Sequence, residues 1–447
     1  MGERVYYRQV TALPPSSPNA IFPAELLQMT TIIDSDPSKS TKATNFQGCQ
    51  PNPQEDWLPI TESRNGSTFS ATFHLLCSGI GLQALLLPIA FASLGWAWGI
   101  ICLPLAFVWQ LYTIFILVGL HEPVYGIRYS RYLQLAKVSF GSKLGKFLAK
   151  FPLMYTSGGT CILLIINGGE ILDLLFKTTC ENEATCHVKP LSSTEGFLVF
   201  TCMAILIAQL PNLNSMTKVS LIGATTAIGY CTLILVLSIT KGRPTGISYY
   251  QSDAMKSNMI KFIDTLNALA IIALAFRGHN VILEIQVPFN GGLLSAYSQI
   301  HGANTSKLMM GLIYLLVLVN RLCTFQVYAM PVFDNMEMRY ITKKKKPCSK
   351  CVRTCLRILF GGLTFLAALA LPFFGSLTLL LGGIALPLTY AYPCFMWIAM
   401  KKPRPNRVVW SINLVLGCFG IVFCVLIVIA AAWTLSDKGL KANFFKP

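Results

Sequence analysis

Apolar stretches, most of about 20 residues, recur along this chain and are separated by short polar connections. A helix of about 20 residues crosses the hydrocarbon core of a bilayer. In lipid, only helices and closed barrels satisfy every backbone N–H and C=O group. The sequence lacks the alternating pattern of about ten residues that is typical of barrel strands. The stretches therefore predict an all-α polytopic membrane protein.

The predicted spans divide the chain into three parts. Residues 1–70 are rich in Pro, Ser and Asn and predict a disordered cytosolic tail, because they cannot bury enough apolar surface to fold. Residues 71–434 form the predicted transmembrane domain, and 435–447 form a short C-terminal tail. Inside the domain, 121–148 predicts a cytosolic loop with a short interfacial helix. The ten predicted spans are 71–92, 95–119, 149–175, 194–211, 218–240, 260–286, 306–331, 355–374, 376–400 and 409–433.

Composition and charge agree with a membrane protein. Only 12% of the residues are charged, against about 25% in soluble domains. The net charge is +17, but Lys and Arg concentrate beside the spans in 128–150, 343–357 and 401–407, as expected of cytosolic loops. A nucleic-acid-binding protein instead displays a basic face on a folded domain. We therefore expect a lipid bilayer around this protein and no nucleic acid.

The fifteen cysteines do not predict a disulfide-rich scaffold, since most of them lie inside the spans. Cys180 and Cys186, between the third and fourth spans, can form a disulfide if that connection faces an oxidising compartment. Cys348, Cys351 and Cys355 lie in a basic juxtamembrane segment without a histidine. S-palmitoylation fits that position better than metal binding, and unreactive thiols are the simpler alternative. No metal site is predicted.

Two spans contain polar or glycine-rich interruptions at matching places, five spans apart. The first span contains CSGIGLQALLLP, with Gly79 and Gly81, and the sixth contains AFRGHNVILEIQ. Interrupted helices in corresponding positions predict a binding site for a small solute between two broken helices. The alternative is that the glycines only allow close helix packing.

The polar residues of the sixth span predict the chemistry of this site. A charged side chain at bilayer depth costs at least about 2.5–3.5 kcal/mol, so Arg277 must line a wet cavity, meet a partner or lie nearer an interface. The half-helix from Val281 onward offers N–H donors and a positive dipole end to a carboxylate. His279 can change protonation near neutral pH. Glu284 is a second proton-coupling candidate or a partner for Arg277, unless it lies at the interface.

Several segments resemble one family, and they cover the chain from about residue 70 to the end. Besides GHNVILEIQ, they are PIAFASLGW, LQLAKVSFGSKLGKFL, QLPNLNSMTKVSLIGA, QVYAMPVFDNME and LPLTYAYPCFMWI. They are similar to the plant amino acid/auxin permease family, and most of all to its lysine/histidine transporter-like branch.

The resemblance implies a proton-coupled amino acid symporter of the plasma membrane, or of another endomembrane, and not an enzyme. It implies a LeuT-like inverted-repeat bundle of the amino acid–polyamine–cation superfamily, normally with eleven helices. The proton gradient would drive import without a cofactor, with amino acids and H⁺ as the partners. By position in the family motif, the substrate-binding residues are Ser78, Gly79, Gly81, Gln83, Phe276, Arg277, Gly278, His279 and Asn280.

This chain departs from the family pattern within the site itself. Gln83 and Leu86 stand where the family usually has glycines, and Arg277 replaces a usual small residue. A glutamine amide at the unwound turn can bind polar substrate atoms or plug the site. The fixed positive charge favours acidic or neutral substrates over lysine.

A larger departure follows Gln286, where the seventh helix of the family is missing. The span that begins near Lys307 already matches the eighth. We count five spans between the basic segments 128–150 and 343–357, and an odd number puts them on opposite faces, whereas both are expected in the cytosol. A re-entrant sixth segment, a reversed second half or a truncated form would each reconcile the two. The alternative function is thus a truncated, non-transporting isoform that acts as an amino acid sensor or a dominant-negative subunit.

Overall fold

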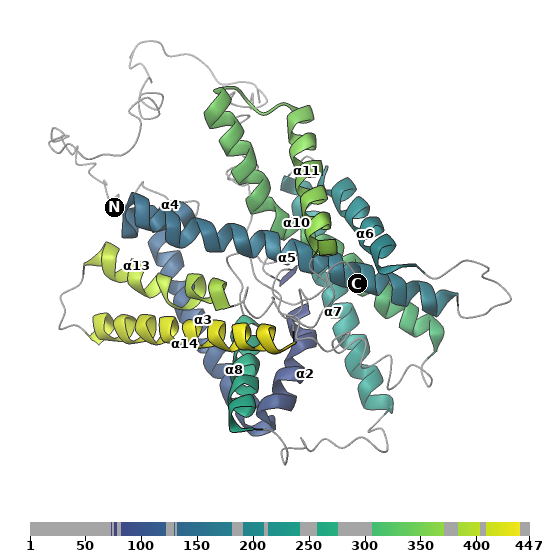
Figure 1. Cartoon of the computed structure of the whole chain (residues 1–447), viewed down its shortest axis with the longest axis horizontal. Coiled ribbons are helices and arrows are strands. Elements are labelled where there is room, and N and C mark those ends of the chain that lie inside the picture. Colours follow the sequence, from purple (N-terminus) through teal and green to yellow (C-terminus); the bar gives the residue numbers. More distant parts are fainter. Residues whose placement is uncertain are drawn as a thin grey trace, which may run out of the picture. The chain divides into compact units, whose positions relative to one another are not determined.

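The computed structural model describes residues 73, 76–77, 82–121, 129, 132–180, 191–209, 213–241, 257–275, 306–370, 383–402 and 408–438. Every long segment among them is helical (Figure 1), which confirms the all-α class. The helices are α2 (Leu82–Leu94), α3 (Trp96–His121), α4 (Tyr132–Phe140), α5 (Ser142–Thr179), α6 (Ser193–Ala208), α7 (Leu213–Lys241), α8 (Asn258–Ala275), α10 (Lys307–Lys344), α11 (Lys350–Ala370), α13 (Tyr392–Lys401) and α14 (Val408–Lys438), with a further helix over 383–390.

Seven helices in the described ranges are long and apolar enough to cross a membrane. They correspond to the second, third, fifth and seventh to tenth spans predicted from the sequence. The first, fourth and sixth predicted spans correspond to α2, α6 and α8, whose described parts are shorter than 20 residues. The chain is therefore a multi-pass helical membrane protein with at least seven candidate spans.

Two helices are much longer than their predicted spans. α5 begins at residue 142 rather than 149, directly after Gly141, whose φ of 85° separates it from α4. Glycine adopts this left-handed region without the steric cost that a side chain adds. α10 continues past residue 331 to Lys344, with Pro331 inside it. Asp334 and Glu337 lie in this extension, beyond the end of the predicted span, and both are buried by the packing of the helices.

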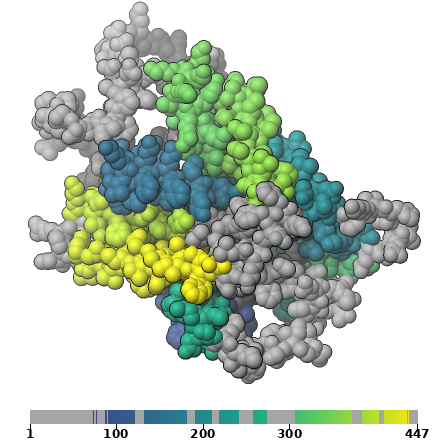
Figure 2. All heavy atoms as spheres, in the orientation of Figure 1, coloured from purple at the N-terminus to yellow at the C-terminus, as the bar shows by residue number. Residues whose placement is uncertain are grey.

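α10 and α5 form the centre of the bundle. In the most apolar window of α10, 61% of the residues are buried, against 17% in α3. α10 packs against α5, α7 and α6, and the largest hydrophobic cluster joins these helices. The helices α3, α11 and α14 instead expose rows of large apolar side chains, which is expected of surfaces that face lipid. Figure 2 shows α5 (blue) between α10 and α11 (green) and α13 and α14 (yellow).

Small residues allow α5 and α6 to approach closely. A Cβ added to Gly168 would lie 2.2 Å from a ring carbon of Phe200, and one added to Gly169 would lie 2.4 Å from Phe197. Membrane helices pack through such small residues because lipid removes the hydrophobic drive between them. Glycine at 168 and 169 therefore fixes the spacing of this helix pair.

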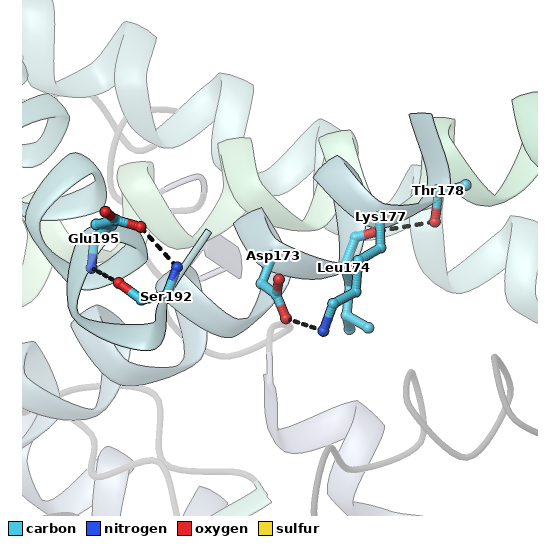
Figure 3. Close-up of polar contacts among 6 residues, drawn as sticks. All are labelled: Asp173, Leu174, Lys177, Thr178, Ser192 and Glu195. Atoms are coloured by element: carbon cyan, nitrogen blue, oxygen red, sulfur yellow. Dashed lines mark hydrogen bonds and ion pairs between the residues drawn. The ribbon is translucent and has the colours of Figure 1, made fainter. Parts of the chain in front are cut away.

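Short-range polar contacts define the ends of α5 and α6 at their connection (Figure 3). Lys177 forms an ion pair with Asp173, with Nζ 2.6 Å from Oδ2. At the start of α6, the Ser192 hydroxyl accepts a hydrogen bond from the Glu195 N–H, and the Ser192 N–H donates to the Glu195 carboxylate at 2.7 Å. This reciprocal capping box satisfies N–H groups that a helix start otherwise leaves unpaired.

Candidate functional site

Most residues of the predicted substrate site lie outside the described residues. This holds for Ser78, Gly79 and Gly81 in the first span, for Phe276 to Asn280 in the sixth, and for Glu284. Gln83 lies in α2, where only its helical backbone is described. The contacts of these side chains with a substrate therefore stay predictions, and the geometry of the site is built from its surroundings.

The two helices that adjoin the predicted breaks pack on each other. α2 begins directly after Gly81 and α8 ends directly before Phe276. Figure 1 shows these helices side by side, and one hydrophobic cluster contains Ala90 of α2 with Ala270 and Ile271 of α8. The predicted partners of the site thus extend from neighbouring helices.

The residue before Ser78 is held between two other helices. Cys77 is fully buried, and its Sγ lies 4.0 Å from the Oγ1 of Thr324 in α10. The Thr324 hydroxyl also donates to the Cys77 carbonyl at 3.5 Å. A Cβ on Gly223 of α7 would lie 2.4 Å from the Cys77 sulfur, so this glycine is needed for the close approach. The first span is therefore anchored to α7 and α10 where the predicted break begins.

The last turn of α8 has its own anchor. The Tyr390 hydroxyl donates a hydrogen bond of 2.6 Å to the Ala273 carbonyl, and the indole of Trp109 packs edge-on against the Tyr390 ring at 4.8 Å between centroids. The last carbonyls of a helix have no partner within it, so an outside donor is required where they are buried. Tyr390 thus supplies a partner where α8 leads into the predicted break.

A buried cluster of polar side chains lies where α5, α7 and α10 meet. Arg321 of α10 is fully buried and donates from Nε to the Asn167 Oδ1 at 3.0 Å and from one terminal nitrogen to the Asn320 Oδ1 at 3.2 Å. Asn320 in turn donates to the Gly223 carbonyl at 2.9 Å. Gly223 therefore contacts both this cluster and Cys77, which connects the cluster to the predicted site.

Arg321 has a second terminal nitrogen that is buried without a hydrogen-bond partner among the described residues. A buried guanidinium with spare donors can bind a carboxylate. Intramembrane charges are costly and mark solute or ion pathways by default. Arg321 was not predicted as a site residue from the sequence, although a lone arginine within the apolar span 306–331 could have indicated it.

A second polar cluster ties α10 to α11 and α6. Glu337 is buried, and its Oε1 lies 3.1 Å from the Nε of Arg353 and 3.9 Å from a terminal nitrogen of Arg357. Arg357 also donates to the Ala208 carbonyl at the end of α6 and lies over the Phe333 ring. The extension of α10 beyond residue 331 is thus fixed by charge pairs.

The structure brings the basic segments to one end of the bundle. Arg339, late in α10, lines the same pocket as Lys143, Lys146 and Lys150, early in α5. Arg321, earlier in α10, meets Asn167, later in α5. α5 and α10 are therefore antiparallel. A hydrophobic cluster with Ala149 of α5, Leu135 of α4 and Met396 of α13 adds the end of α13 to this face. All three basic segments thus flank one membrane face, as the positive-inside rule requires.

The direction of α8 follows from its contacts with α14. α14 leaves this basic end and runs antiparallel to α8, because Thr434 meets Asn267 while Ile427 and Ile271 share one cluster. α8 and α10 consequently both begin at the far end and run towards the basic end. The intervening 276–305, which lie outside the described residues, connect the end of α8 to the start of α10 at the opposite end.

Several cysteines that the sequence singles out lie in the described ranges. Cys180, at the end of α5, is disulfide-bonded, but its partner lies outside the described residues, so the pairing with Cys186 stays a prediction. Cys351 and Cys355 are exposed and Cys348 is half-buried. Within the described ranges no group of three or more His, Cys, Asp or Glu residues is arranged to hold a metal ion.

Apolar helices around buried polar clusters define a multi-pass membrane protein whose interior can meet polar solutes. The chain matches the family of transmembrane amino acid transporter proteins over residues 64–288 and 299–436, and it belongs to that family. It is thus a membrane transporter by family and not an enzyme.

Several curated relatives from Arabidopsis thaliana are similar to the chain over most of its length. It is 44% identical to lysine histidine transporter-like 8, over 89% of this chain and 84% of that protein, and 43% identical to lysine histidine transporter-like 7, over 88% and 90%. It is 30% identical to lysine histidine transporter-like 1, over 88% and 93%. These values confirm the resemblance to the lysine/histidine transporter-like branch.

The comparisons also locate a gap. The family match is interrupted between residues 288 and 299. The alignment with lysine histidine transporter-like 8 runs over 439 positions but covers 89% of the 447 residues, which is about 398 residues. About 40 positions of that relative therefore have no counterpart in this chain, enough for one helix and a connection.

Proposed function

We propose that this protein is a proton-coupled amino acid symporter of the plasma membrane, with its substrate bound between broken first and sixth helices. The observation that carries the proposal is the anchoring of the residues beside both predicted breaks, Cys77 by Thr324 and Ala273 by Tyr390, within a chain of an amino acid transporter family. Arg277 and the N-terminal end of the following half-helix would receive the substrate carboxylate. His279, with Glu284 as a second candidate, would carry the coupled proton.

The proposal extends to the scaffold, which would be an inverted-repeat bundle of ten helices instead of eleven. α8 and α10 both begin at the far end, so the chain between them has to return there. The described part of α8 ends at Ala275, two residues after the carbonyl that Tyr390 bonds, and Tyr390 lies inside its span. A re-entrant sixth segment needs less chain for this return than a full crossing. It would reconcile the odd count of spans with the common face of the basic segments.

Uptake by the purified protein in proteoliposomes, with an acidic outside solution, tests the proposal. We expect labelled amino acid to accumulate only while the proton gradient lasts, and a protonophore should abolish accumulation. Arg277→Ala should reduce uptake while the amount of reconstituted protein stays normal. Well-folded protein without proton-dependent uptake would refute symport, and unchanged uptake by Arg277→Ala would refute the role of Arg277.

The gap of about 40 positions favours a second candidate, a non-transporting sensor or dominant-negative subunit. A matched pair of proteins separates the two functions: the natural chain, and a chimera in which the corresponding segment of lysine histidine transporter-like 8 replaces residues 289–298. Thermal stabilisation by amino acids in both, with uptake only in the chimera, would establish the second candidate. Uptake by both would establish the first.

A further inference from the structure

A pocket of about 610 Å³ lies at the basic end of the bundle, between α5 and α10. Four of its eight lining residues are cations, namely Lys143, Lys146 and Lys150 of α5 and Arg339 of α10, and none is acidic. On α11, Arg353 and Arg357 are instead paired with Glu337. Like charges gathered without a carboxylate repel one another, so this arrangement favours an anion between them.

The cationic and aromatic lining residues lie at different positions along α5. Lys143 and Lys146 lie in the first turns of α5, whereas Phe151, Met154 and Tyr155 lie further along the same helix. From residue 143 to residue 155 the helix rises about 18 Å. Phe151 stacks on Tyr155 with 5.4 Å between ring centroids, and Phe147 and Phe151 remain 71% and 54% exposed. The pocket is therefore cationic at its outer end and aromatic towards the membrane core.

We infer that this pocket binds an anionic phospholipid of the cytosolic leaflet, with its phosphate headgroup among Lys143, Lys146, Lys150 and Arg339 and an acyl chain along Phe151 and Tyr155. The common face of the three basic segments places this end in the cytosol, where anionic lipids are concentrated. A free phosphate would use only the outer half of the pocket. The aromatic half and the exposed phenylalanines match the acyl part of a lipid instead.

Binding of defined lipids to the full-length protein in a neutral detergent tests this inference. The readouts are native mass spectrometry, which counts bound lipids, and the shift in thermal unfolding temperature caused by phosphatidylserine or phosphatidylinositol phosphate. Phosphatidylcholine serves as the neutral lipid, and inorganic phosphate serves as the anion without acyl chains. We expect stabilisation by the anionic lipids, a weaker shift as salt increases, and little effect of the other two.

Matched variants assign the binding to the pocket. The pocket variant carries Lys143→Gln, Lys146→Gln, Lys150→Gln and Arg339→Gln, and the control carries Lys343→Gln, Lys344→Gln, Lys346→Gln and Lys350→Gln, which removes equal charge outside the pocket. A cation beside an anionic lipid headgroup contributes about fivefold to affinity, and only the pocket cations are expected to contact the headgroup. We therefore expect the pocket variant to bind anionic lipid at least about tenfold more weakly, and the control to bind it within about threefold of the natural chain.

Three outcomes would overturn the inference. Equal weakening in both variants would mean that general charge attraction holds the lipid. An equal shift with inorganic phosphate would mean a small-anion site. Absence of any shift with anionic lipid would mean that no site exists. If the fourfold variant fails to fold, the single variants Lys146→Gln and Phe151→Ser test the headgroup and acyl halves separately. Uptake is not a readout, so the outcome is independent of the proposed transport function.

Discussion

The hydrogen bond between Asn167 and Arg321 gives a measurable coupling between α5 and α10. Interhelical hydrogen bonds in membrane proteins contribute about 0.6 kcal/mol on average, because the unfolded chain in the membrane also finds partners. A bond from a charged donor is about twice as strong, and this one is 3.0 Å long with both residues buried. We therefore expect a coupling free energy of about 1–2 kcal/mol.

A double-mutant cycle with Asn167→Leu and Arg321→Met measures this value. Asn167→Leu alone should destabilise by about 1–3 kcal/mol, because it leaves a buried Nε–H without its acceptor. Arg321→Met alone should also destabilise, by about 1–3 kcal/mol, because it leaves the buried Oδ1 atoms of Asn167 and Asn320 without their donor, although removal of a buried charge offsets part of this cost. The free energy of unfolding is taken from SDS titration of protein in bicelles, followed by circular dichroism.

The control pairs Arg321→Met with Gln326→Leu. Gln326 is also buried on α10, but it donates to the Ala204 carbonyl at 2.8 Å and not to the Arg321 cluster. That pair should be additive. A coupling below about 0.3 kcal/mol between Asn167 and Arg321, which is the scatter between independent sites, would refute the reasoning. Loss of uptake in a stable Arg321→Met protein would further assign Arg321 to the transport cycle.

Three further predictions follow from the described contacts. Gly168→Ala should lower the free energy of unfolding by about 1–3 kcal/mol because its Cβ meets Phe200, whereas Gly158→Ala, whose Cβ meets no atom within 4 Å, should be neutral or stabilising in the same titration. Glu337→Gln should destabilise by about 3–5 kcal/mol since it leaves Arg357 buried without its carboxylate, and a smaller loss than in an Arg357→Met protein would contradict this. Burial raises the pKa of the Cys348 thiol and Glu337 raises it further, while Arg353 and Arg357 oppose this, so less thiolate is present at neutral pH. In a maleimide pulse read by mass spectrometry, Cys348 should react more slowly than the exposed Cys351 and Cys355, and the difference should shrink as the pH rises.

Much of the architecture could be predicted because membrane spans are defined by length and hydropathy. The interfacial helix within 121–148 was expected and corresponds to α4. The start of α5 at residue 142 was not predicted, because Lys143 and Lys146 give the first turns of this helix the composition of a loop. The extension of α10 was missed for a similar reason, since its acidic residues are paired only by the fold, with arginines of α11.

Some residues of the candidate site could be predicted from local sequence patterns, and others are recognised only from contacts between distant helices. The broken helices were found from glycines and polar residues next to one another in the sequence. Arg321 was missed because its partner Asn167 lies 154 residues away, and the Gly223 carbonyl that binds the neighbouring Asn320 lies 97 residues from Asn320, so no local spacing marks the cluster. The anchors Thr324 and Tyr390 were equally invisible, because each acts through a hydrogen bond from its hydroxyl to a backbone carbonyl far away in the sequence.

The shared direction of α8 and α10 has a consequence for how the chain is inserted during synthesis. If the number of membrane crossings changed by one, every later helix would normally be inverted. The lysines and arginines of 343–357 would then have to cross the bilayer. Moving these cations through the bilayer is costly, so they favour the orientation in which their end of α10 stays in the cytosol. The basic segment would therefore keep the direction of the later helices the same, whatever the number of crossings before it.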